Sequence, residues 1–152
     1  MLSVLSHAVR CSAHVTPPPW RDCIRRSTPR ICSSGTTGGY EGRTTAQIRA
    51  DEEDPDWVIW NAHIPPGGTP GEQPADVAER CRRVLSACQP FLDADQDVAL
   101  VAHGHVLRIL TATWLGLAAR DGRLFTLGTG TLSKLGFEHA QQVIDVWNAP
   151  NP

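Results

Sequence analysis

The segment 98–117, VALVAHGHVLRILTATWLGL, constrains the fold more than any other stretch of the chain. Val98 to Ala102 form a short apolar run, which predicts a buried strand. His103, Gly104 and His105 follow at once, and from residue 106 apolar side chains recur at helical spacing. A strand that ends in a glycine turn and opens a helix brings backbone N–H groups and polar side chains together. Because open α/β sheets bind ligands at the carboxyl ends of their strands, we expect an α/β fold with a ligand site at these histidines.

Other segments complete a coarse secondary structure. Thr44 or Thr45 can cap a short helix that runs through Ala50. Residues 62–73 are rich in proline and glycine, so they predict an irregular, exposed loop. A helix is expected from Pro74, with Pro90 ending it, and 132–137 and 143–147 are expected to be paired strands.

Four segments, taken in order, resemble motifs of the histidine phosphatase superfamily, which has the phosphoglycerate mutase-like fold. They are the Tyr-Glu-Gly turn at 40–45, the Gly-Glu-Gln-Pro helix start at 71–74, the strand and His-Gly turn at 98–104, and the closing hairpin at 132–147. The resemblance covers roughly residues 38–148. Asp56-Trp57, Trp60 and Phe137-Glu138-His139 look most like the branch of small sugar-phosphate phosphatases. The resemblance therefore implies a three-layer α/β sandwich, incomplete at its N-terminus, and hydrolysis of a small phosphorylated metabolite.

The resemblance also implies roles for individual residues. Members of the family attack a phosphate monoester with a histidine from an Arg-His-Gly motif and form a phosphohistidine. His103 matches the second, phosphate-binding histidine, and Glu72, Gly104 and His105 are candidate phosphate or substrate ligands. Glu72 could equally cap the helix that begins near Pro74. His-x-His also begins some metal motifs, but no acidic residue follows here, so we expect neither a metal nor another cofactor.

The family's nucleophile is missing from this chain, which contains no Arg-His-Gly. The upstream histidines are His7, His14 and His63, and we expect none of them to follow an apolar strand or to precede a glycine turn. Ser34 stands where the family has its glutamate proton donor, and a serine hydroxyl is far too weak an acid for that role. Residues 31–37 can be encoded as ATC TGT TCG AGT GGG ACT ACx. A preceding G and a one-base shift turn this into codons for Asp-Leu-Phe-Glu-Trp-Asp-Tyr, the segment that the family has here, which suggests that the N-terminal region is read out of frame.

Residues 1–37 differ in composition from the rest of the chain. They carry five arginines and one acidic residue, with three consecutive prolines. A transit peptide or a nucleic-acid-binding arm is an alternative, but disordered or frame-shifted sequence fits better. We therefore divide the chain into an irregular segment 1–37, a histidine phosphatase domain 38–148 and a tail 149–152. The domain would then lack its first strand, leaving 98–102 without a neighbour and the chain poorly stable.

Charge and cysteine usage limit the remaining possibilities. A net charge of -2 argues against a nucleic-acid partner, and no apolar run is long enough to predict a membrane span. Five cysteines without Cys-x-x-Cys spacing suggest reduced thiols and a cytoplasmic location. Trp57 and Trp60 are expected to pack, with contact to a sugar as the alternative, and Arg108 is expected to be solvated or structural. The alternative to a phosphatase is a non-catalytic phosphate-binding or interaction module.

Overall fold

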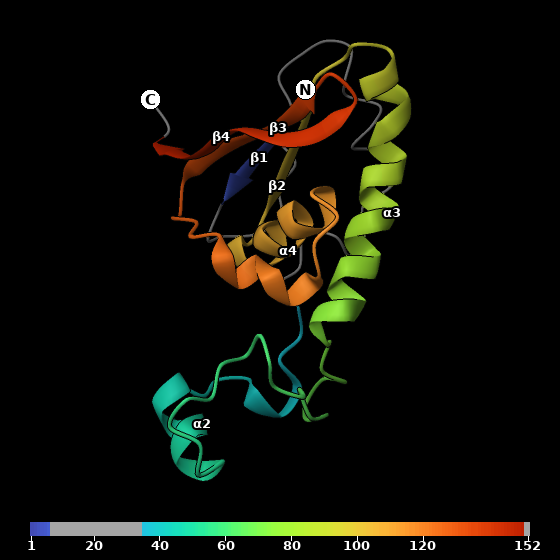
Figure 1. Cartoon of the computed structure of the whole chain (residues 1–152). Coiled ribbons are helices and arrows are strands. Elements are labelled where there is room, and N and C mark those ends of the chain that lie inside the picture. Colours follow the sequence, from blue (N-terminus) through green and yellow to red (C-terminus); the bar gives the residue numbers. More distant parts are fainter. Residues whose placement is uncertain (7–34, 151–152) are drawn as a thin grey trace.

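The structure, a computed structural model, describes residues 1–6 and 35–150 and is built on a four-stranded mixed sheet (Figure 1). The strands are β1 (Leu2–Ser6), β2 (Val98–Ala102), β3 (Thr131–Glu138) and β4 (Gln141–Pro150), and their order is β2-β1-β3-β4. β1 runs parallel to β2 and antiparallel to β3, and β3 and β4 form a hairpin. The expected strands at 98–102, 132–137 and 143–147 are thereby confirmed.

β1 corrects the expectation that residues 1–37 lack regular structure. Leu2 to Ser6 lie between β2 and β3, and Leu2 and Val4 are almost fully buried. β2 therefore has the neighbour that we expected it to lack, and the reason given for poor stability does not hold. A strand of five residues shows too little alternation of apolar and polar side chains to be recognised from the sequence. Its stability comes from pairing with two other strands, which the sequence alone does not show. Residues 7–34 of the same segment lie outside the described residues.

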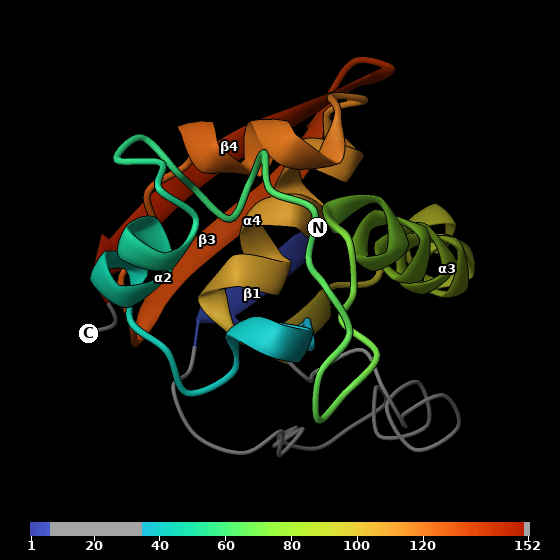
Figure 2. The same cartoon turned by 90° about the horizontal axis from the view of Figure 1, so that it is seen from below.

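The helices lie on one face of this sheet (Figures 1 and 2). α3 (Pro74–Asp93) and α4 (Gly104–Trp114) pack against each other, and the short 3₁₀ helix η2 (Ala119–Leu124) packs against both. α2 (Thr45–Asp51) and the single turn η1 (Gly38–Tyr40) lie further from the sheet. Within 1–6 and 35–150, the elements thus supply the sheet and one helical layer of the expected sandwich.

Two helix ends test the expected boundaries. Thr44 caps α2, accepting a hydrogen bond from the Gln47 N–H, as predicted. Pro90 does not end α3, which continues to Asp93. A proline three residues before the end removes only one backbone hydrogen bond, and Phe91 and Leu92 in this last turn pack against the core.

The main core lies between the sheet and the helices α3 and α4. Its most deeply buried side chains come from the sheet, from α3 and from α4: Leu2, Val4, Val77, Cys81, Val106, Leu107, Ile109, Leu110, Trp114 and Leu135. A second, smaller cluster of Tyr40, Ile48, Trp57 and Ile64 holds the α2 region together. Side chains of both clusters, Ile64 from the smaller one and Val77 and Ile109 from the main one, line the cavity that also contains His105.

Candidate functional site

His103 lies at the carboxyl end of β2, where it is the N-cap residue of α4. Its backbone is extended, its carbonyl accepts the first helical hydrogen bond from Leu107, and its side chain makes no cap hydrogen bond. The N–H groups of the first helical turn, including that of Gly104, have no acceptor within the helix. They carry the partial positive charge of a helix N-terminus, which favours an anion beside the His103 side chain.

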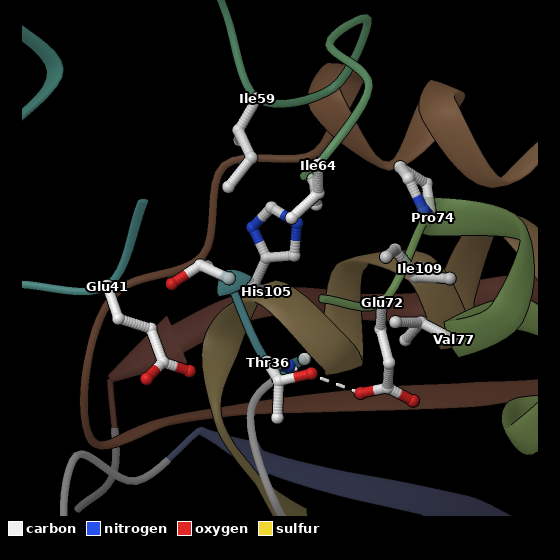
Figure 3. A pocket seen from close by; sticks show the side chains of 11 residues that line it. Thr36, Glu41, Ile59, Ile64, Glu72, Pro74, Val77, His105 and Ile109 are labelled. Carbon is white, nitrogen blue, oxygen red and sulfur yellow. Dashed lines mark hydrogen bonds between the residues drawn. The ribbon is translucent and has the colours of Figure 1, made fainter. Parts of the chain in front are cut away.

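A cavity of about 500 Å³ opens beside this helix start (Figure 3). Two of the predicted site residues, Glu72 and His105, line it together. His103 and Gly104 are not among its described lining residues and precede His105 directly in the chain. The other described residues of the wall are Gly35, Thr36, Thr37, Glu41, Ile59, Ile64, Pro74, Val77 and Ile109.

His105 is fixed by stacking. Its ring lies on that of Trp60, with centroids 4.1 Å apart and planes 16° from parallel, and the Arg108 guanidinium lies 4.6 Å from the Trp60 ring centroid. Burial, and secondarily the charge of Arg108, lowers the pKa of His105 to about 4. The imidazole that faces the cavity is therefore neutral at pH 7. Arg108 donates to the carbonyls of Gly122 and Arg123, which agrees with the structural role expected for it.

The lowered pKa of His105 predicts a pH dependence of stability. Because the folded state disfavours the charged imidazole, the unfolded chain takes up this proton first, near pH 6.5, and stability falls until the pH reaches the folded value of about 4. Between about pH 7 and pH 5 this group is expected to cost roughly 2 kcal/mol. Urea unfolding of the wild type and of His105→Gln at both pH values checks this. A loss as large in the variant as in the wild type would contradict it.

Glu72 does not cap α3. The cap residue is Gln73, whose N–H donates to Asp76 (2.9 Å). Glu72 instead forms a two-point ion pair with Arg80, with Nε to Oε1 at 2.8 Å and Nη2 to Oε2 at 3.0 Å. It also accepts from the Thr36 N–H (3.2 Å) and donates its own N–H to the Thr36 carbonyl (2.8 Å). Glu72 therefore joins the segment at 35–37 to the start of α3, and its carboxylate forms part of the cavity wall.

Sequence reasoning did not select Arg80. The residue is buried, with 8% of its surface exposed. The signal was present, since Arg80 lies three residues after Val77 and four before Val84, on the stripe that faces the core. Its guanidinium is tolerated there because the Glu72 carboxylate neutralises it.

Glu41 is another lining residue that sequence reasoning did not select. The backbone just before Glu41 lies very close to the proline-rich loop. Gly38 has φ +53°, and a Cβ at this position would lie only 2.1 Å from the Pro65 carbonyl oxygen. The Gly39 N–H donates to that same oxygen (2.8 Å), which fastens the Tyr-Glu-Gly turn to the proline-rich loop. The Thr69 hydroxyl donates to Glu41 Oε1 (2.8 Å). The loop is thus irregular, as expected, but it is fixed in place against the cavity.

Metal-ligand clusters and membrane-spanning helices are both absent from the described residues. Within that part of the chain, no group of three His, Cys, Asp or Glu side chains is placed to hold a metal ion. No helix of the same part combines the length and the apolar character needed to cross a membrane.

The fold and the site define an α/β protein with a histidine at the carboxyl end of strand β2, and comparison assigns it to a family. The family description "Histidine phosphatase superfamily (branch 1)" matches residues 36–150, so the chain belongs to this superfamily. An acid phosphatase of Mycobacterium tuberculosis is 34% identical over 109 residues, which are 72% of this chain and 50% of that protein. Glucosyl-3-phosphoglycerate phosphatase of the same species is 32% identical over 136 residues (74% and 57%). The chain spans about half the length of these curated relatives.

Solved structures agree on the fold. The product of an open reading frame of Mycobacterium tuberculosis matches with a TM-score of 0.69 and 31% identity over 79% of this chain and 58% of that one. Mycobacterial glucosyl-3-phosphoglycerate phosphatase matches with a TM-score of 0.62 and 26% identity (80% and 64%). The α-ribazole phosphatase of Shigella flexneri, at 0.59 and 21% (82% and 62%), supports the fold alone. The expected phosphoglycerate mutase-like α/β fold is confirmed.

Proposed function

We propose that this protein acts on a small phosphomonoester, such as a sugar phosphate, by hydrolysis through a phosphohistidine. His103 is the second histidine and binds the phosphoryl group together with the N–H groups at the start of α4, including that of Gly104. Glu72 and His105 contact the rest of the substrate in the cavity. The observation that carries the proposal is the placement of His103 at a helix N-terminus beside a cavity of substrate size. The phosphatase names of the relatives support it.

The sequence contains no Arg-His-Gly motif to supply the family's nucleophilic histidine. His7 directly follows β1, so the expectation that no upstream histidine follows an apolar strand is wrong for this residue. Ser6 pairs with Ala102, the residue before His103. His7 itself lies outside the described residues, and it is flanked by Ser6 and Ala8 instead of arginine and glycine. The domain expected at 38–148 therefore also takes in β1, and β4 extends to Pro150, two residues into the expected tail 149–152. We propose that this chain is catalytically impaired.

The decisive experiment compares the 152-residue chain with a version whose upstream reading frame is restored to encode Arg-His-Gly. Loss of a hydrolase nucleophile lowers turnover by about 10⁶-fold. The present chain should therefore give no trapped phosphohistidine and no appreciable hydrolysis of p-nitrophenyl phosphate, whereas the restored chain should be active without added metal. Robust turnover by the present chain would contradict the proposed impairment. Its His7→Ala variant would then show whether His7 is the nucleophile.

A non-catalytic phosphate-binding module is the second candidate function. One observation favours it: the sequence contains no Arg-His-Gly. A module of this kind would bind vanadate or inorganic phosphate in calorimetry, and the chain with its reading frame restored would remain inactive. Turnover by the restored chain decides against it.

A further inference from the structure

Two carboxylates and one imidazole face the same cavity from separate segments. Glu41 follows η1, Glu72 precedes α3, and His105 lies in the first turn of α4. In Figure 3 the His105 ring lies between the two glutamate side chains, with Thr36 beside it. The described cavity wall therefore contains two carboxylates and one imidazole ring that can form hydrogen bonds.

The two carboxylates differ in how their charge is balanced. Arg80 neutralises Glu72 through two close contacts. Glu41 has a hydroxyl neighbour instead, since Thr69 donates to its Oε1 and no ion pair to Glu41 occurs within the described part of the chain. At neutral pH, Glu41 therefore contributes a negative charge to the wall and keeps one carboxylate oxygen available to accept a hydrogen bond.

His105 adds hydrogen-bonding capacity without adding charge. Its neutral ring has one N–H donor and one acceptor nitrogen, and within residues 1–6 and 35–150 neither is engaged in a hydrogen bond. The stack on Trp60 holds the ring in one orientation. A hydroxyl group can donate to one ring nitrogen or accept from the other, whereas the neutral ring gives a carboxylate no positive charge to pair with.

We propose that Glu41 and His105 make this cavity selective for phosphomonoesters whose other part carries hydroxyl groups and no second negative charge. The inference rests on the proposed function, because it takes the phosphate to lie at His103 and the start of α4. A hydroxyl-bearing group then donates to Glu41 and hydrogen-bonds with His105. A carboxylate in the same position is repelled by Glu41.

Two ligands that differ at a single group test this selectivity. Glycerol 3-phosphate carries a CH₂OH group where 3-phosphoglycerate carries a carboxylate. Calorimetry on the whole chain at low ionic strength should show glycerol 3-phosphate binding about fivefold more tightly, the size expected for one exposed like charge. Glu41→Gln should remove most of this preference. This variant keeps a side-chain oxygen to accept from Thr69, so the fold is retained, and circular dichroism verifies that it is.

Matched controls separate the inference from the proposed function. Glu138→Gln removes an equal charge from the exposed end of β3 and should leave the preference unchanged. His105→Phe, which keeps an aromatic ring against Trp60, should weaken glycerol 3-phosphate binding. Selective binding without hydrolysis in the restored-frame chain would refute the proposed function while supporting the selectivity. Equal or tighter binding of 3-phosphoglycerate, an unchanged ratio in Glu41→Gln, or no binding of either ligand would overturn the inference.

Discussion

Replacing His103 by alanine in a catalytically active form of this protein should lower kcat by about 10²- to 10³-fold, the usual cost of removing one group that stabilises transition-state charge. The proposed role of His103 is to donate to the phosphoryl oxygens while the N–H groups at the start of α4 hold the same group. The loss should appear mainly in kcat, because the negative charge on these oxygens is redistributed as the phosphoryl group is transferred. Steady-state kinetics with p-nitrophenyl phosphate measures it.

His63→Ala is the matched control for this variant. His63 is exposed, and its described contact is made through its backbone carbonyl, which accepts from the Tyr40 hydroxyl. The control should keep wild-type kinetics. An unimpaired His103→Ala, or an equal loss in His63→Ala, would contradict the role assigned to His103.

Replacing Arg80 by methionine is expected to have the largest effect on stability. Methionine keeps much of the volume in the core but leaves the Glu72 carboxylate without its partner, where it is only partly exposed to water. Removing one member of a buried ion pair costs about 3–5 kcal/mol, and the 27% exposure of the Glu72 side chain favours the lower end. Urea denaturation measures the change in the free energy of unfolding.

The double variant Arg80→Met with Glu72→Gln separates the loss of the pair from the loss of packing. A neutral amide can still accept from the Thr36 N–H, so the double variant should regain much of the stability lost by Arg80→Met alone. Equal instability of both variants would mean that the guanidinium acts by packing and not by pairing. The exposed pair of Arg82 with Glu79 gives the reference, since Arg82→Met should change stability by less than about 1 kcal/mol.

Local sequence signals were sufficient for the elements that carry the site. The apolar run at 98–102, the His-Gly turn and the helical spacing after it predicted β2 and α4. Thr44 with Gln47 predicted the start of α2, since a capping box lies within a few consecutive residues. The order of four short motifs was enough for the family, because each motif is a contiguous turn or helix start.

Tertiary structure decided whatever depends on residues far apart in the chain. β1 exists because β2 and β3 pair with it on both sides, and five residues alone cannot show that. Arg80 is buried because Glu72 meets it across the start of α3, and His105 is neutral because burial beside Trp60 and Arg108 disfavours its charged form. The placement of Glu41 in the cavity wall follows from the contact of Gly38 with Pro65. Propensity and periodicity act within one segment, whereas pairing, burial and charge compensation are set by which segments the fold brings together.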